Sequence, residues 1–339
     1  MKIGKHDLTK DGVFIVAEMS ANHNGNFQIA KDTIYAMKES GANAVKLQTY
    51  TADTLTLDCK KEDFVVNGGT LWDGRTLYDL YKEAYTPWEW HEELFKYAKS
   101  LDLEIFSSPF DKSAVDFLEQ FNPPAYKIAS FEITDYDLIE YVAKKQKPII
   151  ISTGIALKEE IEDVVNICKT IGNNQIILLK CTSQYPAPLN KAHLKTIPKI
   201  KNLYDVEVGF SDHTVGYVAP IVAVTLGAVV IEKHFILDKS IGGADCGFSM
   251  DAKNFKNMVK AIRETEQLLN GVDDFKDEKD GRRFCRSIYV CKDIKKGDIL
   301  SEKNLKSVRP GYGMHPKFLK DILGTKAKKD YKFGDRFEK

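Results

Sequence analysis

The sequence predicts an α/β fold, a (β/α)8 TIM barrel followed by a small β-rich domain at the C-terminus. Short β-branched runs recur eight times between residues 13 and 235, and helical segments lie between most of them. The repeat averages about 31 residues, the usual length of a βα unit. Near-continuous apolar runs are typical of parallel strands buried on both faces. Eight such units in this length close a barrel more readily than they form an open sheet.

The expected strands are short runs rich in valine, isoleucine and leucine. They lie at 13–17, 44–48, 104–107, 125–129, 148–152, 175–179, 206–210 and 228–232. The expected helices are recognised by apolar side chains that recur every three or four residues. They include 28–40, 88–100, 112–120, 135–145, 158–170 and 254–269.

One interval breaks the repeat, because the second and third strands are separated by about twice the usual unit length. The excess covers residues 51–87 and is rich in tyrosine and tryptophan. Long insertions after barrel strands rise from the catalytic face, so this segment is predicted to be a substrate loop. A packed surface excursion without function is the alternative.

The chain is expected to divide into a barrel domain, 1–270, a polar and charged linker, 271–281, and a β-rich domain, 282–339. Short apolar runs and glycine-containing turns characterise the last segment. A domain of this size is near the lower limit for independent stability, so we expect it to pack against another surface.

Composition excludes some classes of protein. The 339 residues are 43% hydrophobic and 29% charged, which excludes intrinsic disorder. Lys+Arg and Asp+Glu are both 49, so no basic excess points to nucleic acid. However, 282–339 holds 17 basic and 7 acidic residues, so the acidic excess lies in the barrel. Opposite charges on the two parts favour docking between them, with charge steering the assembly.

Targeting signals are not expected in this sequence. The N-terminus has no apolar core of a signal peptide, and the longest apolar stretch, 218–231, is too short to span a bilayer. The six cysteines form no CxxC pair, which favours reduced thiols over disulfides or a zinc site. We therefore expect a cytoplasmic protein with no membrane partner.

Polar residues stand at the carboxyl end of every expected strand, where barrel enzymes carry their chemistry. In chain order they are Glu18, Lys46 and Gln48, Ser108, Lys127 and Ser130, Ser152, Lys180 and Tyr185, Ser211 with His213, and Glu232 to His234. Any one of these could be structural, but their presence on all eight strands predicts an enzyme.

Cations and small hydroxyl donors form one predicted cluster at these ends. Its members are Lys46, Lys127, Ser108, Ser130, Ser152 and Ser211. Charge-assisted hydrogen bonds are strongest in a dry site, so this set suits a phosphate or carboxylate.

A histidine pair forms the second predicted cluster. His213 and His234 end adjacent strands, and Glu18 and Asp245 supply nearby carboxylates. Such a set suits a divalent metal acting as a Lewis acid. Hydrogen-bonded core histidines are the alternative.

The lysines permit a different chemistry. Lys46, Lys127 or Lys233 could form a Schiff base with a carbonyl substrate, as in a lysine-dependent lyase. The glycine pairs at 242–243 and 311–313 lack the strand–turn–helix frame of dinucleotide or P-loop sites.

Six ordered motifs resemble the sialic (nonulosonic) acid synthase family across nearly the whole chain. They are 17–25 (AEMSANHNG), 45–49 (VKLQT), 126–130 (YKIAS), 209–214 (GFSDHT), 232–235 (EKHF) and 308–313 (VRPGYG). Within the insertion, 71–81 (LWDGRTLYDLY) and 85–90 (YTPWEW) resemble the pseudaminic acid synthase branch of that family.

The resemblance implies condensation of phosphoenolpyruvate with an open-chain acylamino sugar aldehyde, with C–O cleavage and release of phosphate. The branch implies 2,4-diacetamido-2,4,6-trideoxy-L-altrose as the sugar. N-acetylmannosamine or the sugar of legionaminic acid synthesis is the alternative, and a Schiff-base lyase is a more distant one.

The resemblance also implies residue roles. His213 and His234 would bind a divalent metal that polarises the aldehyde, Mn²⁺ first, with Mg²⁺ or Co²⁺ as alternatives. Glu18 would orient or deprotonate the attacking water, and Lys127 would be both catalytic and substrate-binding. Phosphoenolpyruvate would be held by Lys46, Lys127, Ser130, Ser152 and Ser211, and the sugar by Gln48, Tyr185, Asp245 and Arg309.

The C-terminal domain resembles the antifreeze-like (SAF) fold, which in this family crosses to the other subunit of a homodimer. Arg309 would then complete the partner's site. The many basic and bulky residues of this C-terminal domain argue against ice binding. Ser183 stands where the sialic acid branch has asparagine, and Trp72, Trp88 and Trp90 could supply apolar contacts to a deoxy sugar.

Overall fold

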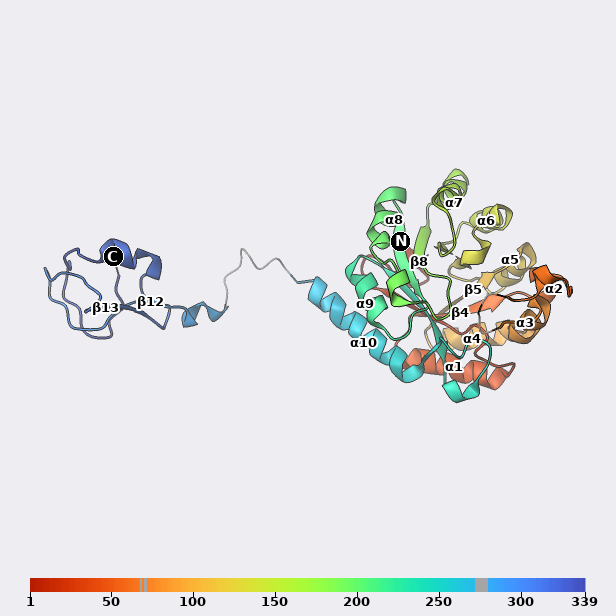
Figure 1. Ribbon diagram of the computed structural model, residues 1–339, viewed down its shortest axis with the longest axis horizontal. Helices are drawn as coiled ribbons and strands as arrows, with labels where there is room; N and C mark the ends of the chain where they lie inside the picture. The colour runs from red at the N-terminus through yellow and green to blue at the C-terminus, as the bar shows by residue number, and fades with distance from the viewer. Residues whose placement is uncertain (68, 70–71, 272–279, 339) are drawn as a thin grey trace. The chain divides into compact units, whose positions relative to one another are not determined.

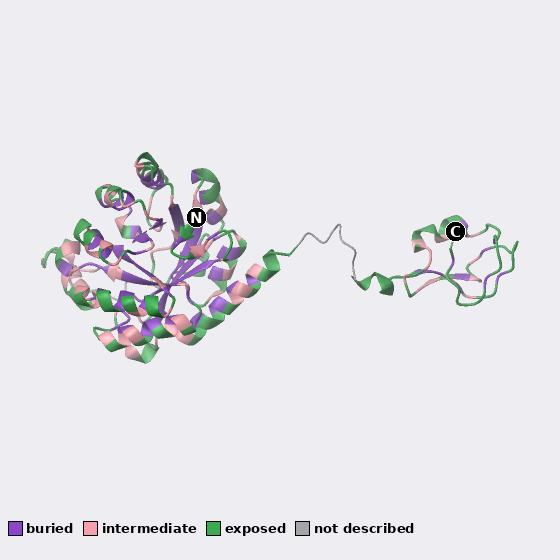
Figure 2. Cartoon of the chain, turned by 180° about the vertical axis from the view of Figure 1, so that it is seen from behind, coloured by how far each residue is buried: buried purple, intermediate pink, exposed green. Residues whose placement is uncertain are grey.

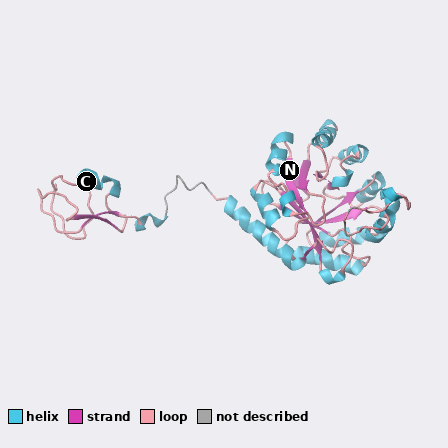
Figure 3. Ribbon diagram, in the orientation of Figure 1, coloured by secondary structure: helices cyan, strands magenta, loops and turns pink. Residues whose placement is uncertain are grey.

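The computed structural model describes residues 1–67, 69, 72–271 and 280–338, in two compact units, Met1–Asn270 and Gly271–Lys339. The first unit is a closed barrel of parallel strands ringed by helices (Figure 1, Figure 3). The expected linker, 271–281, lies largely outside the described residues. No helix in the described ranges has the length and apolar character needed to cross a membrane.

Eight strands form the barrel. They are β3 (Phe14–Glu18), β4 (Ala44–Thr49), β5 (Glu104–Pro109), β6 (Tyr126–Ile128), β7 (Ile149–Ser152), β8 (Ile176–Cys181), β9 (Glu207–Asp212) and β10 (Val230–Ile236). Each pairs in parallel with the next in the chain, and β10 also pairs with β3, which closes the sheet. The prediction of a (β/α)8 barrel is confirmed.

Helices follow the strands and cover the outside of the barrel. They are α1 (Phe27–Glu39), α4 (His91–Ser100), α5 (Lys112–Glu119), α6 (Tyr136–Ala143), α7 (Lys158–Thr170), α8 (Thr196–Tyr204), α9 (Val218–Thr225) and α10 (Ala252–Leu269). Several begin at a side-chain cap, as where Asp111 accepts hydrogen bonds from the first backbone N–H groups of α5. The strands and the inner helix faces are buried (Figure 2).

The alternation of side chains along each strand separates two apolar layers. Phe14, Val16 and Phe106 point into the barrel interior, where Ile3 and Leu8 of the N-terminal segment join them. That segment contains the hairpin β1 (Lys2–Ile3) and β2 (His6–Asp7). The intervening residues, such as those at 15, 17 and 105, pack outward against the helices. On each barrel strand, every second position, in step with the interior residues of that strand, therefore faces the interior.

The insertion after β4 is structured. It contains α2 (Ala52–Leu55), the 3-10 turn η1 (Glu62–Phe64), α3 (Leu77–Ala84) and η2 (Trp88–Trp90), which runs into α4. Helix α2 packs against α3, and Val65 pairs with Thr76 across the intervening loop. Shorter elements elsewhere in this unit are η3 (Ser130–Glu132), η4 (Leu189–Lys191), η5 (Lys239–Ile241) and β11 (Met250–Asp251).

The second unit is β-rich, as expected. It contains η6 (Asp280–Phe284), the antiparallel pair β12 (Ser287–Val290) and β13 (Leu305–Val308), η7 (Pro316–Phe318) and α11 (Leu319–Ile322). Isolated bridges such as Ile294 to Tyr331 connect its loops. Its own core includes Ile288, Leu305 and Phe337, so the small domain buries apolar side chains by itself.

Candidate active site

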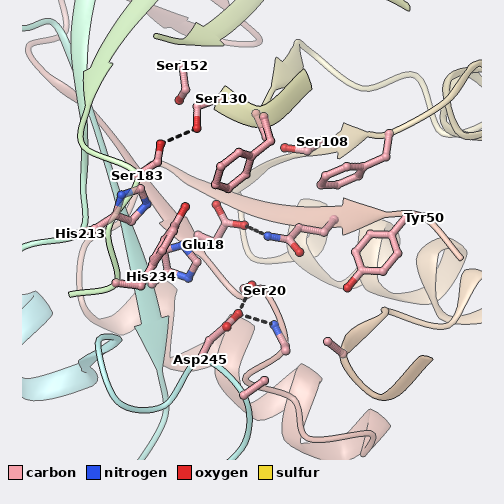
Figure 4. Close-up of a pocket in the computed structure, with 18 of the residues that line it drawn as sticks. Glu18, Ser20, Tyr50, Ser108, Ser130, Ser152, Ser183, His213, His234 and Asp245 are labelled. Carbon is pink, nitrogen blue, oxygen red and sulfur yellow. Dashed lines mark hydrogen bonds between the residues drawn. The ribbon is translucent and has the colours of Figure 1, made fainter. Parts of the chain in front are cut away.

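A cavity of about 410 Å³ lies at the carboxyl end of the barrel strands. Strand parity directs the polar end residues into it, because they share the interior face with Phe14 and Val16. The predicted site residues that line it are Glu18, Lys46, Gln48, Ser108, Lys127, Ser130, Ser152, Tyr185, Ser211, His213, His234 and Asp245. Figure 4 shows several of them converging.

The two lysines of the anion cluster share the carboxylate of Glu232, a residue that the sequence placed at a strand end without a role. Glu232 Oε1 lies 3.2 Å from Lys46 Nζ and 3.7 Å from Lys127 Nζ, and it accepts a hydrogen bond of 3.0 Å from Ser211 Oγ. Lys46 also pairs with Glu18. Glu232 has the parity of His234 on β10, so alternation along the strand identifies it once His234 is assigned to the cavity.

Charge pairing governs ionisation in this cluster. Burial alone would raise the pKa of Glu232, but the ammonium groups of Lys127 and Lys46 outweigh it and lower the pKa to about 2. Burial alone would lower the pKa of Lys46, but the Glu18 and Glu232 carboxylates raise it. Burial lowers the pKa of Lys127. The Glu232 carboxylate and the Lys46 ammonium group are thus held together out of water, which is tolerable only because they are paired.

Hydroxyl groups surround the lysines. Lys127 Nζ donates to Ser152 Oγ at 2.7 Å, and the hydroxyls of Ser130 and Ser183 hydrogen-bond at 2.6 Å. Within the described part of the chain, the buried Ser108 Oγ has no partner. A buried polar atom without a partner is costly, so Ser108 is a ready donor for a bound anion.

The histidine pair has the properties of a ligand set. The rings of His213 and His234 lie 5.4 Å apart between centroids, and both are buried. Burial lowers the pKa of His213 to about 3 and of His234 to about 4, so both imidazoles are neutral at pH 7. Neutral imidazole is the form that binds metals.

Hydrogen bonding defines which nitrogen of His213 is free. His213 Nδ1 lies 3.1 Å from the Thr182 carbonyl, so Nδ1 carries the proton and Nε2 keeps a lone pair. His234 Nδ1 is buried with no partner among the described residues. These two nitrogens fit a divalent transition metal. The described residues contain no group of three or more His, Cys, Asp or Glu placed to hold a metal.

The predicted sugar-binding residues lie in two places. Gln48 Nε2 donates to Glu18 Oε1 at 2.8 Å, Tyr185 packs 4.3 Å from the His213 ring between centroids, and Asp245 pairs with Ser20. All three line the cavity. Arg309 belongs to the second unit and directly follows β13.

The three tryptophans of the insertion have different environments. Trp72 lines the cavity, 6.1 Å from Tyr185 between ring centroids. Trp88 instead stacks on Phe117, and its Nε1 donates to the Tyr50 carbonyl, while Trp90 packs edge-on against His23 and Phe27. The expectation that Trp88 and Trp90 contact a substrate is wrong, because both rings pack against residues of the barrel unit outside the cavity.

The insertion supplies an apolar wall to the cavity. The wall consists of Leu55, Val66, Leu77, Leu80, Tyr81 and Ala84. Tyr50, Phe110 and Phe131 continue it along the strand ends. The cavity lining is therefore two-sided in character, with charged and hydroxyl groups from the strand ends and an apolar surface that includes the insertion.

The three lysine candidates for a Schiff base differ in the face of the strand from which their side chains extend. Lys46 and Lys127 line the cavity. Lys233 has the opposite parity on β10 and forms a buried ion pair with Asp212. Lys233 is thus removed from the candidates, because it lies on the helix side of the barrel.

Comparison with known proteins identifies the class of this barrel. The NeuB family model matches residues 33–274, and the SAF domain model matches residues 286–335. The enzyme class is therefore that of the nonulosonic acid synthases, which join two substrates by condensation. The chain belongs to the NeuB family, as its motifs predicted.

Individual relatives agree with this assignment. The chain is 51% identical to pseudaminic acid synthase of Campylobacter jejuni over 337 residues, covering 99% of this chain and 98% of that one. It is 51% identical to pseudaminic acid synthase of Helicobacter pylori, with 93% of each chain covered. The N,N'-diacetyllegionaminic acid synthase of Legionella pneumophila is 37% identical, with 92% and 90% covered.

A solved structure also matches over nearly the whole chain. The spore coat polysaccharide biosynthesis protein SpsE of Bacillus subtilis aligns with a TM-score of 0.69 at 32% identity. The alignment covers 98% of this chain and 96% of that one.

Proposed function

We propose that this enzyme is a pseudaminic acid synthase. It condenses phosphoenolpyruvate with the open-chain aldehyde of 2,4-diacetamido-2,4,6-trideoxy-L-altrose and releases phosphate by C–O cleavage. The observation that carries the proposal is the 51% identity to pseudaminic acid synthases over nearly the full length of both chains. The two-sided cavity supports it, because the substrates are a small anion and a sugar with several methyl groups.

The charged side of the cavity suits phosphoenolpyruvate. Lys46 and Lys127 would neutralise its phosphate and carboxylate, and the hydroxyls of Ser108, Ser130, Ser152 and Ser211 would complete the hydrogen bonding. Charge-assisted bonds of this kind are strongest where water is excluded. Glu232 already holds both lysines, so they are positioned before the anion arrives.

The condensation forms a carbon–carbon bond and a bond from C2 to a water oxygen, and it breaks the bond from C2 to the phosphate oxygen. C3 of phosphoenolpyruvate attacks the aldehyde carbon, whose oxygen gains a proton and becomes a hydroxyl. Water adds to C2 and loses a proton, and phosphate then leaves from C2, which becomes the ketone carbon. Burial raises the pKa of Glu18, although Lys46 opposes the shift, and this favours its use as the base that takes the proton from water. Gln48 holds the Glu18 carboxylate in place.

A divalent metal would be held by His213 and His234, Mn²⁺ first, with Mg²⁺ or Co²⁺ as alternatives. When bound, it supplies Lewis-acid polarisation of the aldehyde oxygen. The two neutral imidazoles and the unpartnered Nδ1 of His234 support this assignment.

The other side of the cavity suits the sugar. Gln48, Tyr185 and Asp245 would bind its polar groups, while the apolar wall of the insertion and Trp72 would face the two acetamido methyls and the methyl at C6. A hydroxyl at C6 would be left without a partner against such a wall, at a cost of about 1–3 kcal/mol.

Three sugars tested with phosphoenolpyruvate decide the substrate. We expect phosphate release to be at least about tenfold faster with the diacetamido-trideoxy-L-altrose than with N-acetylmannosamine or the legionaminic acid precursor. Faster turnover of either of the others would overturn the proposal.

Borohydride reduction with pyruvate is expected to trap no adduct, and a trapped adduct would support the Schiff-base alternative.

Glu132 is expected to make phosphoenolpyruvate binding depend on pH. Burial raises the pKa of this cavity carboxyl to about 7, so it is neutral below pH 7 and anionic above it. The anionic form repels the substrate, so the KM for phosphoenolpyruvate should rise as pH increases through 7.

Steady-state kinetics of Glu132→Gln between pH 6 and 8.5 check this expectation. The rise in KM should be flattened in this variant, while Glu140→Gln on the exposed surface of α6 should keep the wild-type profile. Phosphoenolpyruvate itself ionises in the same way in the assays of all three enzymes, so a difference between their profiles comes from the protein. Superimposable profiles for Glu132→Gln and wild type would remove Glu132 from this role.

We further propose a cytoplasmic homodimer in which the C-terminal domain of one subunit brings Arg309 to the site of its partner. Exposed apolar residues follow several strand ends on the side of the cavity mouth, namely Phe131, Ile155, Leu157, Leu189, Val215 and Val218. Such side chains are typical of a surface that another chain covers. The basic excess of 282–339 against an acidic barrel supports the same pairing. No nucleic acid or membrane partner is proposed.

Salt is expected to weaken this assembly. Because screening reduces attraction between exposed charges, raising NaCl from 50 to 500 mM should weaken dimerisation or lower activity. Sedimentation velocity and initial rates measure the two effects. Insensitivity of both would contradict the role given to charge.

A further inference from the structure

The two metal-ligand candidates are each preceded by a buried charged residue on the other face of the same strand. Asp212 precedes His213, and Lys233 precedes His234. Asp212 is 1% exposed and Lys233 is 2% exposed. They are register partners on the parallel strands β9 and β10, and Lys233 Nζ lies 2.5 Å from Asp212 Oδ2.

This ion pair also holds the backbone beyond β9. Lys233 Nζ donates to the Thr214 carbonyl at 2.7 Å, and the Thr214 N–H donates to Asp212 Oδ1 at 2.8 Å. His213 therefore lies between two residues that are both held by the ammonium group of Lys233. The same lysine is covalently adjacent to His234, so one side chain connects the positions of both imidazoles.

The other contacts of His213 do not connect it to His234. The ladder between β9 and β10 ends at the pair Asp212 and Lys233, so His213 lies just beyond it. The segment after β8 contacts His213 from the opposite side, through the Thr182 carbonyl and through Ala187, whose N–H donates to the His213 carbonyl. Neither of these contacts fixes the position of His213 relative to His234.

Stability alone explains this pair poorly. Two charges lose their hydration when buried, and apolar residues of similar volume are often as stable or more stable in such places. The positions are on the helix-facing side of the two strands, whose other outward residues, such as Phe210, Ile231 and Phe235, belong to the apolar core. A charged pair here is better explained by the directional bonds that it makes to Thr214 and across the strands.

We propose that Asp212 and Lys233 are positioning residues that set the separation of His213 and His234 for metal binding. They act through the two histidines and do not touch the substrate. This inference rests on the metal site described under the proposed function. Residues that orient metal ligands from outside typically change metal affinity by about 10–100-fold when replaced.

The test is Mn²⁺ affinity, measured on the full-length protein by electron paramagnetic resonance or calorimetry. The double variant Asp212→Asn with Lys233→Met removes both charges, and the introduced amide keeps an acceptor for the Thr214 N–H. We expect Mn²⁺ to bind about 10–100-fold more weakly, with the KM for phosphoenolpyruvate nearly unchanged because Lys46 and Lys127 are untouched. The single variant Lys233→Met should lose more thermal stability than the double variant, since it leaves Asp212 unpaired.

Two controls separate this inference from the metal site itself. His213→Ala should abolish tight Mn²⁺ binding; if it does not, the proposed metal site fails. The variant Glu119→Gln with Lys147→Met removes another ion pair, 2.7 Å long, that lies away from the cavity, and should leave Mn²⁺ affinity unchanged. Unchanged affinity in the Asp212 and Lys233 double variant, together with loss in His213→Ala, would overturn the positioning role alone.

Discussion

Replacement of His213 with alanine is expected to lower turnover about a thousandfold while the barrel stays folded. His213 and His234 are neutral because burial lowers the pKa of each, so both offer a lone pair to a cation at pH 7. A Lewis acid at the aldehyde contributes several kcal/mol to the transition state, and each 1.36 kcal/mol is tenfold in rate. Removing one of two protein ligands should forfeit most of that contribution.

Rates of phosphate release measure this effect, in the wild type with and without chelator and in His213→Ala. Chelation should reduce the wild type to a similar level, and Mn²⁺ should restore it but not the variant. His193→Asn is a suitable control, since His193 is exposed and has a positive φ of 47°, which asparagine tolerates. Full activity after exhaustive chelation would contradict the metal role.

Lys127→Met is the second large effect that we expect, a loss of about 10²–10³-fold in kcat/KM for phosphoenolpyruvate. The Lys127 ammonium group is buried, donates to Ser152 Oγ at 2.7 Å and lies 3.7 Å from Glu232. Removal of one partner from a desolvated charge contact costs about 2–5 kcal/mol, much of it from the charge left unpaired. The loss should fall on phosphoenolpyruvate and leave the KM of the sugar nearly unchanged.

Lys180→Met provides a matched comparison for that variant. Lys180 lies near the end of β8 and donates to the Cys181 carbonyl, but it is not among the residues that line the cavity. Its replacement should leave kcat/KM within about twofold of wild type. Equal losses in the two variants would show that Lys127 acts through stability and not through contact with the substrate.

The strand ends show how far sequence reasoning reaches into the site. Eight apolar runs with polar ends predicted both the barrel and the clustering of residues as distant in sequence as Glu18 and His234, which the register of β10 with β3 makes neighbours. Glu232, Lys233 and His234 are all polar and consecutive, and their order alone does not say which of them face the interior. For this reason Glu232 was given no role, and Lys233 was kept as a Schiff-base candidate.

The insertion shows where sequence reasoning failed. Its aromatic residues predicted contact with a substrate, yet Trp72 lines the cavity while Trp88 and Trp90 pack against Phe117 and His23. A tryptophan that contributes to the core and one that faces a ligand have the same composition and similar spacing. Only the path of the chain through α2, α3 and η2 separates them.

The sequence by itself determined the fold class, the family and the residues that lie at the strand ends, because these follow from local periodicity and short ordered motifs. The tertiary structure decided which of those side chains share the cavity, that Glu232 joins the two lysines, and that Asp212 and Lys233 connect the two histidines from the other face. The physical reason is that alternation along a strand tells which residues share a face, but it does not tell which of the two faces points into the barrel. Closure of the barrel, through contacts between residues far apart in the chain, gives each strand its inner face.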